Sequence, residues 1–472
     1  MESNIEDFAD KAISHALALK CHYCDVRAEI ITKEGLVIEN GQIEHTVSMF
    51  DRGLGIRVLN DGAWGFFSVS NPSSIAEIIA ATDAAVSSAR YYTKKQKIRL
   101  ASIPTIKDKI VFPVRKEPDI EELAKIGFDC DKIIHEKKRI IKSSVSIGYS
   151  KTKKYFASSE GSKITQEYTD VVSELSATAH ESGLTQSVDS TEGGRGGIEK
   201  LSDEKDIFDT AKFVSEMSSN LIDAKPASEE KATVVMNPDF VALLTHEILG
   251  HPSEADRVLG KEMAWAGGAW WAGNIGKQVG SQNLDVFDDP TISGSLGWYG
   301  YDDEGVKSSK TSLIENGILV NHMQNRETAE IFNAKPSANM RATSYKFMPL
   351  IRMACTCIGK GDWNPQEMIR DVKSGYLVSN MKVPSIDMKR YNWSISCQFA
   401  QKIENGELTD LLRDVIVIGT APEFFKSIDA CGKDFTVRPI TNCGKGDPMQ
   451  SMIMGNGGPT IRAVATVKSV KS

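Results

Sequence analysis

The first half of the chain alternates between helical and strand-like patterns of apolar residues. Four segments place apolar residues at helical spacing and are predicted helices: residues 4–19, 74–91, 119–138 and 203–222. Other segments alternate with a period of two and are predicted strands: residues 24–32, 35–39, 45–51, 53–60, 63–69, 140–149 and 166–180. The dipeptides Asn40-Gly41 and Asp61-Gly62 predict hairpin turns. We therefore expect an α/β domain with a mixed or antiparallel sheet.

The pattern changes near residue 226. A short polar linker at residues 223–228 follows the last of these helices, and the rest of the chain is rich in glycine and in strand-forming residues. Hairpin dipeptides recur at residues 316–317 and 405–406, and the clearest later helical period covers residues 365–374. The chain is too long for one ordinary core. We predict an α+β protein with an N-terminal α/β domain at 1–226 and a β-rich, barrel-like domain at 227–472.

One short motif in the second domain carries candidate chemistry. Residues 246–251 read HEILGH and follow an apolar helical run, so two imidazoles and a carboxylate stand close together. Neutral imidazole is a common zinc ligand, and Glu247 is placed to accept a proton from a water molecule on the metal. The alternative is a buried helix end with two hydrogen-bonded histidines. A third ligand must come from elsewhere, because catalytic zinc usually has three protein ligands and an open position.

The spacing of the two histidines differs from that of the familiar zinc-peptidase helix. In HExxH the histidines are four residues apart, whereas His246 and His251 are five apart, which separates them by about 140° on an ideal α-helix. Gly250 precedes the second histidine and Pro252 follows it. We predict that the helix stops at His251 and that Gly250 lets the chain turn this side chain toward the metal.

Charge and composition exclude several classes of function. The net charge is −7, with 56 basic and 63 acidic residues, so no basic field attracts nucleic acid. No apolar run approaches the 18 or more residues of a membrane helix. The first residues are acidic and lack the apolar core of a signal peptide. We expect a cytoplasmic protein that binds neither nucleic acid nor membrane.

The eight cysteines do not suggest a disulfide framework in a chain of this length. Cys21 and Cys24 form an isolated CxxC, which we interpret as structural thiols. Cys431 and Cys443 each precede Gly-Lys. One of these two is the candidate for the third metal ligand.

The chain resembles the TldD/PmbA family of peptidases, known as modulators of DNA gyrase. The resemblance rests on an ordered set of segments that spans most of the chain: residues 53–57 (GLGIR), 62–66 (GAWGF), 246–251 (HEILGH), 254–256 (EAD), 302–305 (DDEG), 313–317 (LIENG), 349–353 (PLIRM), 443–446 (CGKG) and 455–462 (GNGGPTIR). Only the TldD branch of the family carries the histidine motif. The resemblance therefore implies a zinc-bearing, catalytic subunit with an N-terminal α/β domain and a C-terminal β-rich domain.

The resemblance also implies a set of site residues. The zinc ligands are His246, His251 and Cys443, with Glu247 as general base. Cys443 is preferred over Cys431 because the family's cysteine precedes Gly-Lys and then the terminal glycine-rich segment. Lys445, two residues further on, is placed to favour the thiolate.

Several further residues are candidates for supporting roles. Glu254 and Asp256 are either acceptors for imidazole N–H groups or solvated residues after the helix end. His322 is either a donor to the transition state or a surface histidine. Trp265, Trp270 and Trp271 stand among glycines and either line a peptide channel or pack within the protein.

The leading hypothesis is a zinc metallopeptidase that hydrolyses small or unfolded polypeptides and binds them by adding a strand to a sheet edge. The resemblance implies a closed chamber made by two subunits, either a homodimer or a heterodimer with a PmbA/TldE-like sibling that lacks the metal motif. One alternative is a non-catalytic binding or maturation partner with a structural metal, for which Cys431 is the candidate fourth ligand. Another is a zinc amidase that acts on small molecules.

Overall fold

The computed structural model describes residues 5–91, 97–203, 206–262 and 268–470. Its N-terminal half is built on one seven-stranded sheet with the order β3-β2-β1-β5-β6-β4, in which β7 pairs with β6. The strands are β1 (Tyr23–Glu39), β2 (Gln42–Asn60), β3 (Ala63–Ser70), β4 (Lys107–Val111), β5 (Ile140–Ser158), β6 (Lys163–Glu181) and β7 (Leu184–Arg195). Neighbouring strands are antiparallel except β4 and β6, so the sheet is mixed.

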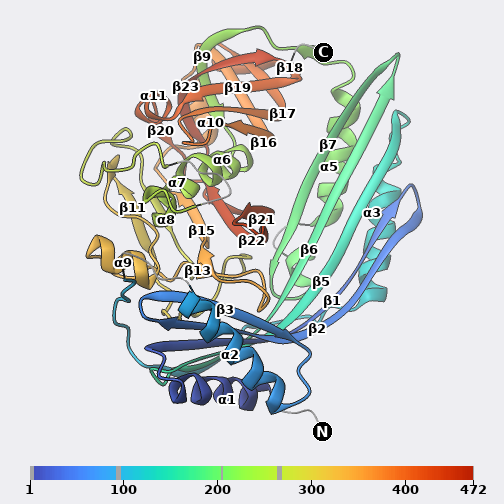
Figure 1. The fold of residues 1–472 in the computed structure, drawn as a ribbon. Helices are drawn as coiled ribbons and strands as arrows, with labels where there is room; N and C mark the ends of the chain where they lie inside the picture. Colours follow the sequence, from blue (N-terminus) through green and yellow to red (C-terminus); the bar gives the residue numbers. More distant parts are fainter. Residues whose placement is uncertain (1–4, 92–96, 204–205, 263–267, 471–472) are drawn as a thin grey trace.

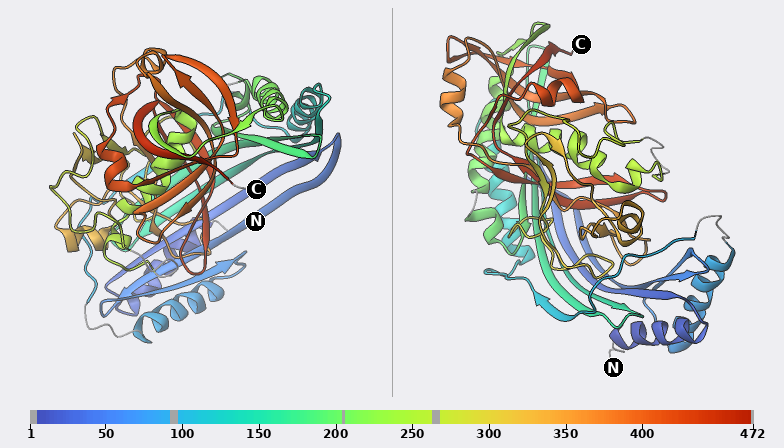
Figure 2. Two further views of the ribbon diagram at one scale, coloured as in Figure 1. Left: turned by 90° about the horizontal axis from the view of Figure 1, so that it is seen from above. Right: turned by 90° about the vertical axis from the view of Figure 1, so that its left-hand side faces the viewer.

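Helices cover one face of this sheet in two groups. The helices are α1 (Ile5–Ala18), α2 (Ile75–Tyr91), α3 (Ile120–Ile134), α4 (Glu199–Ser202) and α5 (Ile207–Asn220). One apolar core joins α1 and α2 to the β1–β3 end, and another joins α3 and α5 to β5, β6 and β7. The long strands bend between these two groups, as the right-hand view of Figure 2 shows.

The C-terminal half contains a closed barrel. Strands β16, β9, β23, β19 and β17 pair in a ring that the β16–β17 pairing closes, while β18, β8 and β20 extend it. These strands are β8 (Lys225–Pro226), β9 (Glu230–Met236), β16 (Ser374–Ile386), β17 (Asn392–Glu404), β18 (Glu407–Arg413), β19 (Val415–Thr420), β20 (Ala430–Cys431) and β23 (Ile461–Ser469). The barrel lies at the upper end of the molecule in Figure 1.

A second C-terminal sheet has the order β12-β11-β10-β15-β22-β21, and β13 and β14 form a separate pair. The strands are β10 (Val286–Asp288), β11 (Thr311–Glu315), β12 (Ile318–Leu319), β13 (Met340–Arg341), β14 (Leu350–Ile351), β15 (Cys355–Ile358), β21 (Thr436–Lys445) and β22 (Gln450–Gly458). The helices of this half are α6 (Pro238–Leu244), η1 (Thr245–Gly250), α7 (His251–Ser253), α8 (Ala255–Val258), α9 (Arg326–Phe332), α10 (Pro365–Arg370) and α11 (Ala421–Lys426).

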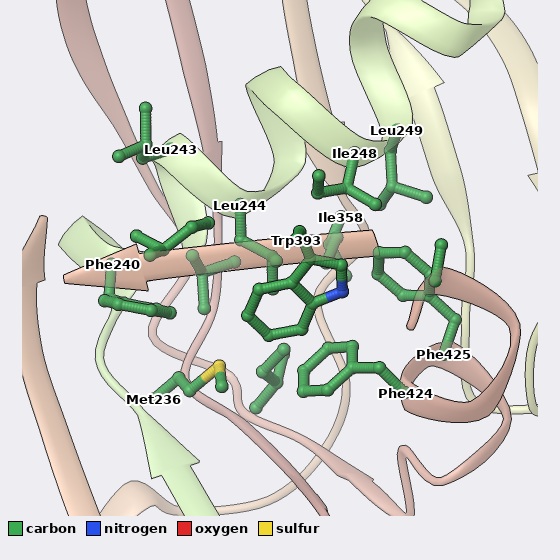
Figure 3. Packing of buried hydrophobic residues seen from close by; sticks show 14 of the residues in the cluster. Met236, Phe240, Leu243, Leu244, Ile248, Leu249, Ile358, Trp393, Phe424 and Phe425 are labelled. Atoms are coloured by element: carbon green, nitrogen blue, oxygen red, sulfur yellow. The ribbon is translucent and has the colours of Figure 1, made fainter. Parts of the chain in front are cut away.

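The histidine motif lies on a helix that is buried between the barrel and this second sheet. Asn237 caps α6 by accepting the backbone N–H of Phe240 at 3.0 Å, and Pro238 occupies the first helical position, where no N–H is needed. Phe240 and Leu244 point into the barrel core near Trp393, and Ile248 lies near Ile358 of β15 (Figure 3). The motif is therefore anchored on a fully buried apolar face.

Buried ion pairs join the two halves of the chain. Arg57 on β2 donates to Asp25 on β1 and, at 3.0 Å, to Glu304 in the C-terminal half. Glu304 also accepts the backbone N–H of Arg326 at 2.7 Å. Arg57 and Glu304 are 247 positions apart in the sequence. The pairs hold the long sheet against the C-terminal half.

The predicted fold class is confirmed: the protein is α+β, with a mixed N-terminal sheet and a C-terminal barrel that is adjacent to the histidine helix. The division after residue 226 stays a prediction. None of the helices in the described segments is long and apolar enough to cross a membrane.

Candidate metal centre

A π-helical turn places the two histidines of the motif together. Residues 245–250 form this turn, and the backbone N–H of His251 donates to the carbonyl oxygen of His246, five residues earlier. A π turn brings residues five apart onto one face, as an α turn does for residues four apart. The prediction that the helix stops at His251 is wrong, because helical structure continues through α7 to Ser253.

Gly250 has a different role from the predicted one. Its φ is −66°, an ordinary helical value, so it provides no turn. A Cβ atom at this position would lie 2.0 Å from the sulfur of Met353. Glycine is required here because Met353, which is fully buried, packs directly against the helix backbone.

His246, His251 and Cys443 form a buried group of three metal-ligating side chains. Their donor atoms all lie within 4.8 Å of one another, and Sγ of Cys443 is 3.6 Å from Nε2 of His251. Tetrahedral zinc, with bonds of about 2.0–2.3 Å, separates its ligand atoms by roughly 3.3–3.6 Å. A set of two imidazole nitrogens and one thiolate also matches catalytic zinc in chemistry. The residues present therefore fit a zinc ion with one open position.

Outer contacts fix both imidazole rings. Nδ1 of His246 lies 2.9 Å from Oδ1 of Asn456 on β22, and Nδ1 of His251 lies 3.1 Å from Oε2 of Glu254. Each ring therefore presents its Nε2 toward the shared site. Asn456 was not identified from the sequence, although an asparagine among glycines in a strand-forming segment could have drawn attention to it.

Glu254 belongs to a buried charge network behind His251. Its Oε2 also accepts from Nε of Arg257 at 2.8 Å and from Nζ of Lys445 at 3.1 Å. Burial would raise the pKa of Glu254, but the charges of Lys445 and His251 outweigh it and hold the pKa well below its usual value. Asp256 accepts from Nζ of Lys445 at 2.8 Å, whereas the Nδ1 atoms of the two histidines are hydrogen-bonded to Asn456 and Glu254.

The thiol of Cys443 is poised to lose its proton. Burial would raise its pKa, but His246 and His251 lower it well below the usual value. Burial also lowers the pKa of His246, and the nearby thiolate reverses this and raises it to about 9. The stabilisation of the thiolate comes from the two histidines, whereas Lys445 is engaged by Glu254 and Asp256.

Glu247 pairs with a cation from a distant hairpin. Its Oε2 accepts from Nη1 of Arg390, in the connection between β16 and β17. Burial would raise the pKa of Glu247, but Arg390 and the two histidines lower it, so the carboxylate is ionised at neutral pH. Arg390 lies 143 positions from Glu247, and no local pattern in the sequence pointed to it.

A cavity of about 520 Å³ opens onto the three ligands and Glu247. Five elements line it: the histidine helix, β16, β21, and β6 and β7 of the long sheet. Glu174 on β6 and Asp189 on β7 are the acidic lining residues that the long sheet contributes. Burial and the neighbouring charge of Glu174 raise the pKa of Asp189 to about 6.

The tryptophans support the histidine helix. Pro252 has no N–H, so the carbonyl of Ile248, four residues earlier, lacks its α-helical donor. Nε1 of Trp270 donates to this carbonyl at 3.1 Å, and Nε1 of Trp271 donates to the carbonyl of Pro252 at 2.7 Å. Trp271 is fully buried, and neither side chain lines the cavity, so the structure favours packing within the protein over a peptide channel. Trp265 lies outside the described residues.

Two other candidates lie away from the ligand group. His322 is buried and packs against the ring of Phe332, so the interpretation as a surface histidine is wrong. Burial lowers its pKa to about 4, and it does not line the cavity. Sγ of Cys431 contacts the carbonyl of Asn283 at 3.3 Å, and Cys431 is not part of the ligand group. All eight cysteines are free and buried.

Comparisons with known proteins address the family directly. Three family models match: PmbA/TldA metallopeptidase domain 1 at residues 24–89, the central domain at 115–222 and the C-terminal domain at 229–467. A metalloprotease of Methanocaldococcus jannaschii is 34% identical over 94% of this chain and 96% of its own length. A zinc metalloprotease TldD homologue of Saccharolobus solfataricus is 28% identical over 96% of this chain and 97% of its own.

Solved structures share the fold across the whole chain. A protein of Thermotoga maritima described as a modulator of a DNA gyrase has a TM-score of 0.81 at 17% identity and covers 98% of this chain and 99% of its own. TldE of Thermococcus kodakarensis has a TM-score of 0.78 at 16% identity, with 98% and 100% covered. The ordered motifs, the three family models and the relatives over nearly the full length agree, and the chain belongs to the PmbA/TldD family of metallopeptidases.

Proposed function

We propose that this protein is a zinc-dependent peptidase that hydrolyses small or unfolded polypeptides, with His246, His251 and Cys443 as ligands and Glu247 as general base. One observation carries the proposal. Two imidazoles and a thiolate converge within 4.8 Å, and the carboxylate of Glu247 faces the same cavity. Ligand atoms alone suit a structural site, but an ionised carboxylate beside them in an open cavity suits hydrolysis.

Zinc held by these ligands would supply Lewis-acid polarisation of the scissile carbonyl and would lower the pKa of water. The protein residues do the remaining work. Glu247 accepts the proton of the attacking water and returns it to the leaving amine. Asn456 and Glu254 hold the two imidazoles in one orientation, and the thiolate of Cys443 contributes negative charge.

The size of the cavity supports an extended substrate. About 520 Å³ accommodates a small ligand or a few residues of a peptide, and it excludes a folded domain. The relatives are named as metalloproteases, which supports a peptide over another amide. We propose that the peptide enters as an added strand, a mode that tolerates many sequences because backbone groups make the contacts.

Two alternatives remain distinct from this proposal. A non-catalytic maturation partner with a structural metal would need a fourth protein ligand, and the described segments place only three donors together. A zinc amidase for small molecules would use the same residues, and only the substrate would distinguish it.

We propose further that the protein works in the cytoplasm, where its eight free thiols stay reduced, and that it pairs either with a second copy or with a TldE-like sibling. The molecular mass of the purified protein, measured by light scattering alone and with the sibling, distinguishes the two partners.

Cleavage of a quenched, unstructured peptide tests the function. Wild type should cleave it, whereas Glu247→Gln, which keeps the shape of the side chain, should lose activity by about 10²–10⁴-fold with its zinc content unchanged. Cleavage of small amides but not of the peptide would favour the amidase. Bound zinc without cleavage by wild type, alone or with the sibling, would contradict the proposal.

Cysteine variants test the ligand assignment separately. Cys443→Ser should lose zinc on dialysis, because a weakly acidic hydroxyl replaces the thiolate. Cys431→Ser is the matched control, since this buried thiol is outside the ligand group, and it should retain one zinc ion per chain. Loss of zinc from Cys431→Ser alone would refute the assignment.

A further inference from the structure

The connection between β16 and β17 places a guanidinium against the carboxylate of Glu247. Nη1 of Arg390 pairs with Oε2 of Glu247, and both residues line the cavity that contains the three ligands. The two side chains are 16% and 15% exposed, so the pair is largely shielded from water. A cation in this position can act on the general base and on a substrate in the cavity.

One carboxylate organises the turn that carries Arg390. Oδ1 of Asp387 accepts the backbone N–H groups of Lys389 at 3.0 Å and Tyr391 at 2.9 Å, and its Oδ2 accepts that of Asn392 at 2.8 Å. The N–H of Arg390 donates to the carbonyl of Asp387 at 2.9 Å. The turn therefore holds Arg390 in a defined place.

Arg390 has a backbone conformation that favours glycine. Its φ is +60°, in the left-handed region, where a side chain strains the backbone. The bonds to Asp387 maintain this conformation. Strained residues of this kind cluster at functional sites, and here the strained residue is the one whose side chain reaches Glu247.

Most of the hydrogen-bonding capacity of Arg390 remains available. A guanidinium has five N–H donors in a fixed fork, and the contact with Glu247 is the one hydrogen bond that this side chain makes within the described segments. The other cation lining the cavity, Lys382, lies on β16 with an exposed side chain. Arg390 is therefore the cation held beside the base.

We propose that Arg390 is a catalytic residue that holds Glu247 toward the reacting water and donates its free N–H groups to the oxygen of the scissile carbonyl. This inference rests on the proposed hydrolysis. The water oxygen bonds to the carbonyl carbon, Glu247 takes the proton, and the π electrons move to the carbonyl oxygen, where Arg390 stabilises the charge. The C–N bond then breaks, the C=O bond re-forms, and the leaving nitrogen takes the proton from Glu247.

Kinetics of Arg390 variants test this role. In Arg390→Gln, kcat for the quenched peptide should fall by about 10²–10³-fold, the loss typical for one oxyanion donor, with KM changed by less than about threefold. Arg390→Lys should recover part of kcat, because the charge remains while the planar fork is lost. Lys389→Gln, in the same turn but with an exposed side chain, is the control and should match wild type.

Two measurements separate catalysis from a structural role. A phosphinic peptide, which mimics the tetrahedral species, should bind Arg390→Gln more weakly by about the same factor as the loss in kcat, while the product peptides bind equally well. Arg390→Gly and Arg390→Gln both lose the ion pair with Glu247, but glycine also relieves the backbone strain, so the thermal midpoint of Arg390→Gly should exceed that of Arg390→Gln while its kcat is equally low.

The outcomes are distinguishable from those for the proposed function. Equal kcat in wild type and Arg390→Gln would overturn the inference and leave the peptidase intact. A loss that appears only in KM, or unchanged binding of the phosphinic peptide, would also overturn it. Absence of cleavage by every protein, with zinc bound, would overturn the proposed function and this inference together.

Discussion

Replacement of Glu254 by glutamine tests how far the charge network behind His251 supports the metal site. Glu254 is fully buried, and its Oε2 accepts from three donors: Nδ1 of His251 at 3.1 Å, Nε of Arg257 at 2.8 Å and Nζ of Lys445 at 3.1 Å. Glutamine preserves the size of the side chain and removes its charge. Lys445, also fully buried, then retains Asp256 as its one anionic partner among the described residues.

The magnitude follows from these contacts. Breaking a buried ion pair by removing one partner typically costs about 3–5 kcal/mol. Because Asp256 remains beside Lys445, we expect the lower end, about 3 kcal/mol, for the free energy of unfolding without metal. Loss of the acceptor for a ligating histidine typically weakens metal binding about 10–100-fold, which corresponds to roughly 1.4–2.7 kcal/mol.

Two assays separate these effects. Urea unfolding of the metal-free protein reports the loss of stability as a lower midpoint, and competition with a zinc chelator reports the loss of affinity. Glu407→Gln removes a carboxylate from an exposed position on β18 and should change neither quantity. An unfolding midpoint and a zinc affinity of Glu254→Gln that both match wild type would refute the reasoning.

Two further substitutions test other parts of the site. Gly250→Ala places a Cβ 2.0 Å from the sulfur of Met353, so overpacking should lower the free energy of unfolding by about 1–3 kcal/mol and lower zinc occupancy. Helix propensity alone would instead raise the unfolding midpoint in urea, and a higher midpoint would contradict this prediction. Asp189→Asn should stabilise the protein at pH 7 by up to about 3 kcal/mol, because burial first, and then Glu174, raises the pKa of Asp189 from 3.8 to about 6. In wild type, the folded state binds the carboxyl proton of Asp189 more tightly than the unfolded state does, so wild type loses stability as the pH rises from about 4 to about 6. The gain in Asp189→Asn, measured by urea unfolding, should therefore shrink toward zero near pH 4, and an equal gain at pH 4 and pH 7 would argue against the assignment.

Local sequence patterns predicted helices and strands well where residues close in sequence determine the secondary structure. The helix predicted at residues 4–19 is α1, Ile5–Ala18, because its apolar residues share one face that packs on the sheet. The four short strands predicted between residues 24 and 60 are two long ones, β1 and β2. Strand β7 was not predicted, because polar residues alternate along it and its pairing with β6 provides the stability.

For the candidate site too, the local motif predicted some features, and others depend on distant parts of the chain. The motif at residues 246–251 identified both histidines and Glu247, because metal ligands on one helix must recur at a fixed spacing. That spacing revealed neither the π turn nor the long-range contacts of this helix with Met353, Trp270 and Trp271.

By itself, the sequence determined the amphipathic helices, the hairpins, the strand-rich character of the second half and the chemical type of the site, since these depend on residue types at short separations. The family resemblance had already favoured Cys443 over Cys431, whereas only the tertiary structure brought Asn456 to His246 and Arg390 to Glu247. Asn456 lies 210 positions from His246. Such contacts depend on how sheets and helices pack around a common core, and no local pattern of residues encodes that packing.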